Sequence, residues 1–325
     1  MNFSKKNVLV TGGTGLIGKP LVERLLSKDA VVRIVSLDDV SRAHPEAEFL
    51  KLDLTNFENC KKAVSGMDYV FNLVGVKSSP KTDNTKPASY FVPTLMFDTN
   101  MMEASRREGV KGYLFTSTVG VYAPAEIFHE DDVWKTFPLE KGKFQAWSKR
   151  IGELQAEAYA IEYGWNNISI VRPTNVYGPY DNFDSENSMV VPSLIKRVVD
   201  GENPLVVWGD GSQVRDFVFS EDVADCMIAV AEKGIIQPIN IGSGKGYSIR
   251  ELVDTILKIS EDKPEVVYDT SKPSGDKIRI MDISRATSLV GWSPKTSLEE
   301  GIKKTIQWYE SNKGVAGKRY DVFNK

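Results

Sequence analysis

Three regularly spaced glycines follow a short apolar run near the amino terminus. Residues 7–11 read Asn-Val-Leu-Val-Thr, Gly12, Gly15 and Gly18 come next, and apolar residues recur at helical spacing over 16–26. A strand, a glycine turn and a helix N-terminus in this order bind a pyrophosphate, because backbone N–H groups and the helix dipole favour negative charge. Gly12 should allow the tight turn, Gly15 should admit the pyrophosphate and Gly18 should let the helix pack closely. The segment predicts dinucleotide binding through Gly12, Thr14, Gly15, Leu16, Ile17 and Gly18.

Two acidic residues after the next apolar run bear on the choice of coenzyme. Asp38 and Asp39 follow the β-branched run at 31–37. A carboxylate there accepts hydrogen bonds from the ribose hydroxyls and repels an added phosphate, so Asp38 favours NAD over NADP. Ser36 stands where the acid most often falls when counted from the glycine turn, and Arg42 is near enough to meet a phosphate. NADP therefore stays open as the less favoured coenzyme.

Asp53 closes the third apolar run and has two interpretations. It either contacts the adenine amino group, beside Leu54, or caps the helix that follows. The sequence does not decide between them.

Apolar runs of strand length alternate with helical patterns through the first half of the chain. This alternation predicts an α/β fold, a doubly wound parallel sheet of the Rossmann type with helices on both faces. Strands are expected at 7–11, 31–37, 48–52, 69–74, 112–116 and 168–171, and helices at 16–26, 60–64, 94–108 and 144–163.

The alternation breaks after Arg172-Pro173, where Gly178-Pro179 and the polar stretch 181–188 intervene. A smaller, discontinuous α/β substrate domain is expected from there, while the strand at 238–241 could rejoin the main sheet. We predict a dinucleotide-binding domain over 1–173 with about 216–242, and a nucleotide-sugar domain over 174–215 and 243–325.

Composition excludes several classes of protein. The 325 residues are 41% hydrophobic and 26% charged, which is typical of an ordered globular chain and not of a disordered one. The formal net charge of −3 gives no overall field for nucleic acid or an anionic membrane. Two cysteines, Cys60 and Cys226, are too few for a disulfide framework or a thiolate zinc site, so we expect both as thiols in the core. The two histidines, His44 and His129, are expected at the surface, and no metal site is expected. No signal peptide or membrane-spanning run is evident, so we expect a cytoplasmic protein.

Several motifs together resemble the extended short-chain dehydrogenase/reductase family, also called the NAD-dependent epimerase/dehydratase family. They are the glycine turn at 11–18, the strand end at 115–122, the block Arg-Pro-Thr-Asn-Val-Tyr-Gly-Pro at 172–179, Arg-Asp-Phe at 215–217 and Asn-Ile-Gly-Ser-Gly at 240–244. Within that family, segments 181–192 and 292–301 look most like the GDP-L-fucose synthases, which epimerise a 4-keto sugar and reduce it at C4.

The resemblance implies a catalytic hydroxyl and a Tyr-x-x-x-Lys pair. Thr118 matches the hydroxyl and Lys149 the lysine, but Gln145 stands at the tyrosine position. An amide cannot exchange a proton with a sugar oxygen as a phenol does, and losing a general acid/base costs about two to four orders of magnitude in rate. Gly120 and Met189 replace the cysteine and histidine that resembling synthases use to epimerise, so epimerisation at C3 and C5 is not expected.

The resemblance also implies ligand contacts. For the coenzyme these include Leu73, Val74, Lys149 and Pro173, and for the nucleotide sugar Thr118, Asn175, Asn187, Val190, Arg215 and Arg279. The two arginines are expected on phosphates, whose oxygens a guanidinium contacts in pairs. Trp208 could stack on a base, but a buried core tryptophan is the favoured interpretation.

These observations favour an NAD-dependent oxidoreductase acting at C4 of a nucleotide sugar, with a GDP-hexose or GDP-heptose preferred and the direction of hydride transfer open. Two alternatives remain: an epimerase or dehydratase that oxidises its sugar transiently, and a non-catalytic NAD-binding protein. A homodimer through the helices at 94–108 and 144–163, or a tetramer, is expected.

Overall fold

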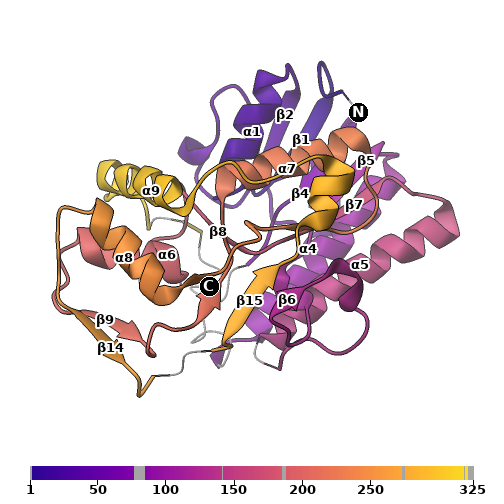
Figure 1. The fold of residues 1–325 in the computed structure, drawn as a ribbon. Coiled ribbons are helices and arrows are strands. Elements are labelled where there is room, and N and C mark those ends of the chain that lie inside the picture. Colours follow the sequence, from indigo (N-terminus) through magenta and orange to yellow (C-terminus); the bar gives the residue numbers. More distant parts are fainter. Residues whose placement is uncertain are drawn as a thin grey trace.

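The computed structural model describes residues 2–76, 85–140, 142–184, 188–272, 275–317 and 319–320. Its main sheet has seven strands in the order β12-β7-β5-β4-β1-β2-β3, all parallel (Figure 1). Strands β4 and β5 are buried at every position, as expected for a sheet covered on both faces. The predicted doubly wound α/β fold is confirmed. The strands are β1 Asn7–Thr11, β2 Val31–Ser36, β3 Glu48–Lys51, β4 Tyr69–Asn72, β5 Gly112–Thr116, β7 Ile168–Pro173 and β12 Ile239–Ile241.

Helices cover both faces of this sheet. Helices α1 (Gly18–Ser27) and α7 (Ser220–Lys233) pack together on one face, and α2 (Phe57–Val64), α4 (Ala88–Arg107) and α5 (Lys143–Tyr163) pack on the other. Helix α4 begins at Ala88, earlier than the predicted start at 94, and Pro93 lies inside its second turn. The predicted core positions of Cys60 and Cys226 are confirmed, since both side chains are fully buried.

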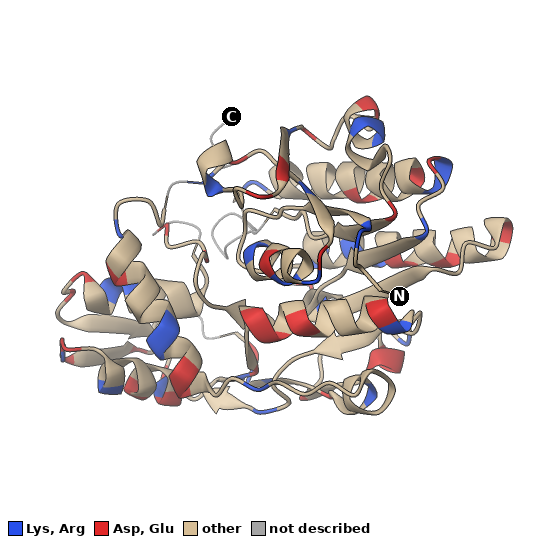
Figure 2. Ribbon diagram, turned by 90° about the horizontal axis from the view of Figure 1, so that it is seen from above, with Lys and Arg blue, Asp and Glu red and all other residues tan. Residues whose placement is uncertain are grey.

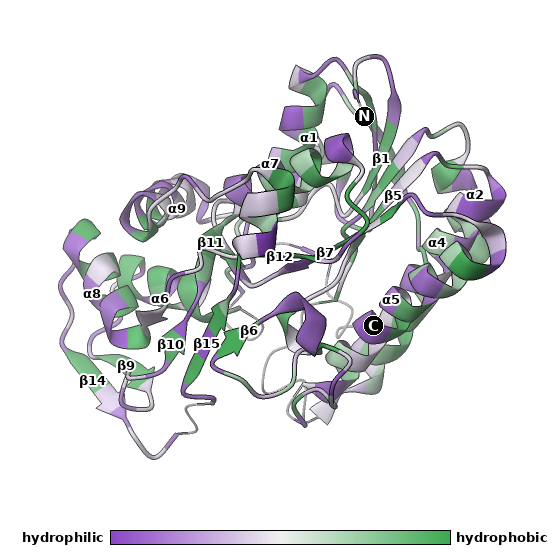
Figure 3. Cartoon of the chain, turned by 45° about the vertical axis from the view of Figure 1, so that its right-hand side comes forward, coloured by the Kyte–Doolittle hydropathy of each residue, from purple (hydrophilic) through white to green (hydrophobic). Residues whose placement is uncertain are grey.

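A second, smaller region is built around its own apolar core. Helices α6 (Val190–Val199), α8 (Ile249–Ile259) and α9 (Leu298–Asn312) pack with the strand pair β9 (Leu205–Trp208) and β14 (Val266–Asp269). Figure 3 shows hydrophobic and hydrophilic patches on α6 and α8, as expected for helices with one buried face. Helix α8 starts at a capping box between Ser248 and Glu251.

Short strands connect the two regions. A four-stranded sheet has the order β13-β10-β15-β6, and β8 pairs with β11. Because β12 pairs with β7, the segment at 239–241 rejoins the main sheet as expected. The exact boundaries of the two domains stay a prediction. The remaining elements are β6 Ile127–Phe128, β8 Asn175–Tyr177, β10 Val214–Arg215, β11 Phe217–Phe219, β13 Tyr247–Ser248 and β15 Ile278–Met281, with helical turns at Val40–Arg42, Val119–Val121, Glu130–Asp132 and Ala286–Val290.

Charges of both signs are interspersed along the helices in the view of Figure 2, in keeping with the near balance of acidic and basic residues. Across the described ranges, no helix is both long and apolar enough to cross a lipid bilayer.

Candidate active site

A cleft of about 1690 Å³ runs along the carboxyl ends of the central strands and continues into the smaller region. Its walls come from the glycine turn after β1, the segments after β4 and β5, the start of α5, and α6 with β9 and β10. Parallel α/β sheets bind ligands at this edge, where the chain leaves neighbouring strands in opposite directions. The cleft therefore collects residues that lie far apart in the sequence.

The glycine turn has the geometry that the sequence predicts. Gly12 has φ +67°, the left-handed conformation that glycine adopts without strain. A Cβ on Gly18 would lie 2.2 Å from the Gly12 carbonyl oxygen, so α1 can approach the turn only with glycine there. Thr14, Gly15, Leu16 and Ile17 line the cleft beside them. The turn thus presents backbone N–H groups and the N-terminus of α1 to a ligand.

Asp38 lies in the cleft at the end of β2, with only 6% of its surface exposed. Its carboxylate accepts a hydrogen bond from the Thr14 hydroxyl at 2.7 Å. Burial raises the pKa of Asp38, but Arg319, the Tyr320 backbone N–H, Thr14 and Arg42 together hold it below its ordinary value. Asp39 is exposed, and its carboxylate accepts from the Ser41 backbone N–H; it does not line the cleft.

Asp53 and Leu54 line the same cleft after β3, and Leu73 and Val74 line it after β4. The Asp53 carboxylate accepts hydrogen bonds from the backbone N–H and the hydroxyl of Thr55. The alternative that Asp53 caps the next helix is wrong, because Asn56 is the N-cap of α2. Asp53 instead shapes the turn before that helix.

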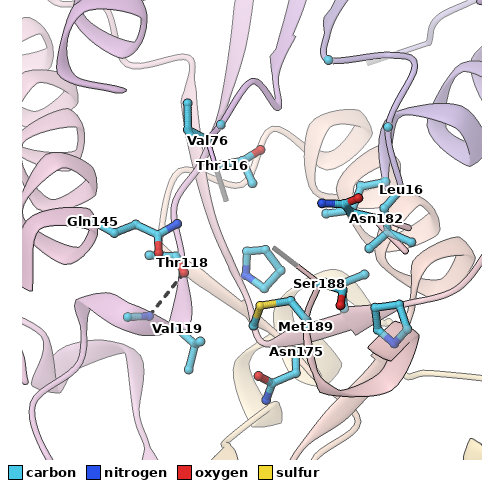
Figure 4. Close-up of a pocket in the computed structure, with 18 of the residues that line it drawn as sticks. Leu16, Val76, Thr116, Thr118, Val119, Gln145, Asn175, Asn182, Ser188 and Met189 are labelled. Atoms are coloured by element: carbon cyan, nitrogen blue, oxygen red, sulfur yellow. Dashed lines mark hydrogen bonds between the residues drawn. The ribbon is translucent and has the colours of Figure 1, made fainter. Parts of the chain in front are cut away.

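The predicted catalytic residues Thr118, Gln145 and Lys149 all line one part of the cleft. Gln145 and Lys149 are one turn apart on α5, and Figure 4 shows the Gln145 amide directed toward Thr118. The Thr118 hydroxyl accepts from the Gly120 backbone N–H at 3.3 Å. Two hydrogen-bonding side chains therefore lie close to Lys149 in the cleft, but neither is a phenol.

Lys149 belongs to a buried network that sequence reasoning missed. Its ammonium donates to Asp98 at 2.9 Å, and the Asn72 amide donates to the same carboxylate at 3.1 Å. Asn72 in turn accepts from the Thr11 hydroxyl at 2.7 Å, which ties Lys149 to the start of the glycine turn. Burial raises the pKa of Asp98 to about 6 even though Lys149 lowers it. No local spacing marks Asp98, since only the packing of α4 against α5 brings it to Lys149.

Two arginines lie side by side in the part of the cleft that the smaller region forms. Arg215 and Arg279 are paired in register on β10 and β15, and both line the cleft. Burial and the neighbouring Arg279 lower the pKa of Arg215, while Asp276 raises it. Arg279 also forms an ion pair with Asp276, and the two adjacent guanidinium groups suit a diphosphate.

The remaining substrate predictions have different outcomes. Asn175 and Val190 both line the cleft. The Asn175 amide donates to the Asp216 carbonyl at 2.9 Å. Asn187 lies outside the described residues. The interpretation of Trp208 as a core residue is wrong: it is 56% exposed and lines the cleft at the end of β9, because β9 turns into the opening there.

Among the described residues that line the cleft, the tyrosines do not take the place of the missing phenol. Tyr122 donates its hydroxyl to Asn240, and Tyr320 lies near Asp38. The phenol of Tyr113 lies near Asp98 but is buried and does not line the cleft. Gly120 and Met189 line the cleft as well, and Figure 4 shows the Met189 side chain there. Neither a glycine nor a thioether can remove a proton from carbon.

The residues present fit a dinucleotide. Besides the glycine turn, the hydroxyls of Thr116 and Ser117 are buried at the end of β5 and have no hydrogen-bond partner within the described part of the chain. Both residues line the cleft, and Pro173 closes it at the end of β7. Buried hydroxyls are normally paired, so these two mark a place where a polar ligand can bind.

Comparison with known proteins places the chain in a family. The model of the NAD dependent epimerase/dehydratase family matches residues 8–242. The chain belongs to this family. It is 32% identical to GDP-L-fucose synthase 1 of Arabidopsis thaliana, over 96% of this chain and 95% of that protein, and 33% identical to GDP-L-fucose synthase of Sinorhizobium fredii, over 94% and 96%. The structure of UDP-glucose 4-epimerase from Thermotoga maritima superimposes with a TM-score of 0.83 at 29% identity, over 94% of this chain and 99% of that one.

Proposed function

We propose that this protein is an NAD-dependent oxidoreductase that acts at C4 of a nucleotide-activated sugar, with a GDP-sugar preferred, and that it does not epimerise its substrate. The observation that carries the proposal is the cleft itself. It joins the glycine turn, Thr118 and Lys149 to the arginine pair Arg215 and Arg279, while Gln145 replaces the expected phenol.

When bound, the nicotinamide would exchange a hydride with the sugar carbon. Thr118 and Gln145 would orient the C4 oxygen by hydrogen bonds, and the Lys149 ammonium would stabilise negative charge that develops on it. Asp98 holds that ammonium in place at 2.9 Å. The accompanying proton would come from Thr118, Lys149 or water, which predicts slow turnover.

The choice of NAD rests on Asp38. Its buried carboxylate, held in the ionised form by the groups around it, would accept hydrogen bonds from the ribose and repel a 2′-phosphate. The choice of a GDP-sugar rests on the relatives, two of which are GDP-L-fucose synthases.

The proposal is tested by following nicotinamide absorbance with a panel of 4-keto and 4-hydroxy sugars activated by GDP, UDP, CDP or dTDP, run in deuterated water. We expect a change in absorbance with a GDP-sugar and no deuterium at C3 or C5. Deuterium on those carbons would show an epimerase instead. Coenzyme binding with no sugar-dependent change in absorbance would show a non-catalytic protein.

We also propose that α4 and α5 form a homodimer interface. These two helices pack together and expose Val92, Met96, Ile151, Leu154 and Ile161, which are 39% to 79% exposed. Apolar side chains gathered on adjacent helices are typical of a surface that another chain covers.

A further inference from the structure

The segment at the carboxyl end of the described chain lies against the glycine turn. The Tyr320 backbone N–H donates to the Asp38 carboxylate at 2.9 Å, although the two residues are 282 positions apart. The neighbouring guanidinium, that of Arg319, lies 3.6 Å from the other Asp38 oxygen. Gly317, Arg319 and Tyr320 all line the cleft. This segment is therefore part of the wall that surrounds the predicted coenzyme site.

Arg319 also reaches the turn itself. A Cβ on Gly15 would lie 3.0 Å from the Arg319 Nη2 atom, so the guanidinium lies directly over this glycine. Gly15 is the residue whose missing side chain is expected to admit the coenzyme pyrophosphate. The cation thus lies beside the backbone that would hold two negative phosphates.

A second arginine lies near the Asp38 carboxylate. The side chain of Arg42 lies 3.8 Å from the carboxylate that Arg319 also approaches. Burial and the proximity of Arg319 lower the pKa of Arg42, which shows that the two cations are close enough to repel each other. An anion that binds at Gly15 would reduce this repulsion between the two guanidinium groups.

We propose, on the basis of the function proposed above, that Arg319 is a coenzyme-binding residue that pairs with the pyrophosphate. In the structure its guanidinium lies beside Asp38, and it would shift from over Gly15 to pair with a diphosphate that binds there. The glycine turn supplies N–H donors, and Arg319 supplies the counter-charge that the turn lacks.

The experiment measures direct binding of NADH and NADPH to the full chain by nicotinamide fluorescence, independently of any sugar. Arg319→Gln is compared with the unmodified protein and with Arg107→Gln, which removes an exposed arginine that pairs with Glu103 on α4. We expect Arg319→Gln to weaken binding of both coenzymes roughly ten- to hundredfold, as loss of a charge-assisted bond does, and Arg107→Gln to leave it unchanged. The weakening should shrink at high salt.

Other outcomes would overturn the inference. Unchanged binding would reduce Arg319 to a partner of Asp38, and tighter binding would show that the segment competes with the coenzyme. A loss confined to NADPH would place Arg319 at the 2′-phosphate and not at the pyrophosphate. If the unmodified protein binds neither coenzyme, the proposed function itself fails, and this inference fails with it. Urea unfolding of Arg319→Gln checks that the fold is intact.

Discussion

Replacing Lys149 by methionine should leave the buried carboxylate of Asp98 without its ion-pair partner. In the Lys149–Asp98 pair the side chains are only 7% and 2% exposed, and the two charged atoms are 2.9 Å apart. Removing one partner of a buried ion pair costs about 3–5 kcal/mol, because the other charge stays buried without compensation. We expect Lys149→Met to lose this much free energy of unfolding at about pH 8.

The loss should depend on pH in a defined direction. Burial raises the pKa of Asp98 to about 6 in the folded protein, and Lys149 lowers it, so the pKa should rise further in the variant. A carboxyl whose folded pKa exceeds its unfolded value of about 3.9 contributes stability below that value and loses it as the pH rises through the folded pKa. The defect of Lys149→Met should therefore be smaller at about pH 5 than at about pH 8.

The assay is urea unfolding at both pH values, with Asp98→Asn/Lys149→Met as the compensating variant. The double variant has no buried charge at this place and should recover most of the loss. Lys111→Met is the matched control, because Lys111 is 64% exposed and its pair with Asp68 should contribute about 1 kcal/mol at most. An equal loss at both pH values with no recovery in the double variant would refute the reasoning.

Three further predictions test other parts of the site and surface. Gln145→Tyr should raise the turnover rate about a hundredfold or more, because it restores a phenol one helical turn from Lys149; a rate that stays the same would show that the proton takes another route. Gly18→Ala should abolish coenzyme binding measured by fluorescence, since its Cβ would lie 2.2 Å from the Gly12 oxygen, and intact binding would contradict the close packing of α1. Leu154→Glu should give a monomer in light scattering, and an unchanged mass would exclude α5 from the interface.

The network around Lys149 changes how the missing tyrosine is understood. The sequence alone suggests a site that has only lost a proton donor. In the structure the lysine is held by Asp98, and Asp98 is held by Asn72. The ammonium is thus positioned by a buried carboxylate and an amide, which suits electrostatic stabilisation of an oxyanion.

The glycine turn, the order of strands and helices and the substitution at Gln145 could all be predicted from the sequence. Each depends on residues that are neighbours in the chain: Gly12 and Gly18 act within one turn, and Gln145 and Lys149 act within one helix. Local spacing fixes these features, because backbone geometry relates residues that are close in sequence.

The partners of the charged groups were decided only by the tertiary structure. Asp98 meets Lys149 because α4 packs against α5, and Arg319 meets Asp38 because the chain returns to the first glycine turn after passing through the smaller region. Trp208 faces the cleft for a similar reason, since the position of β9 relative to the opening sets its exposure. No periodicity encodes such contacts, because they arise from how separate elements pack, and a buried charge is stable only where that packing supplies a partner.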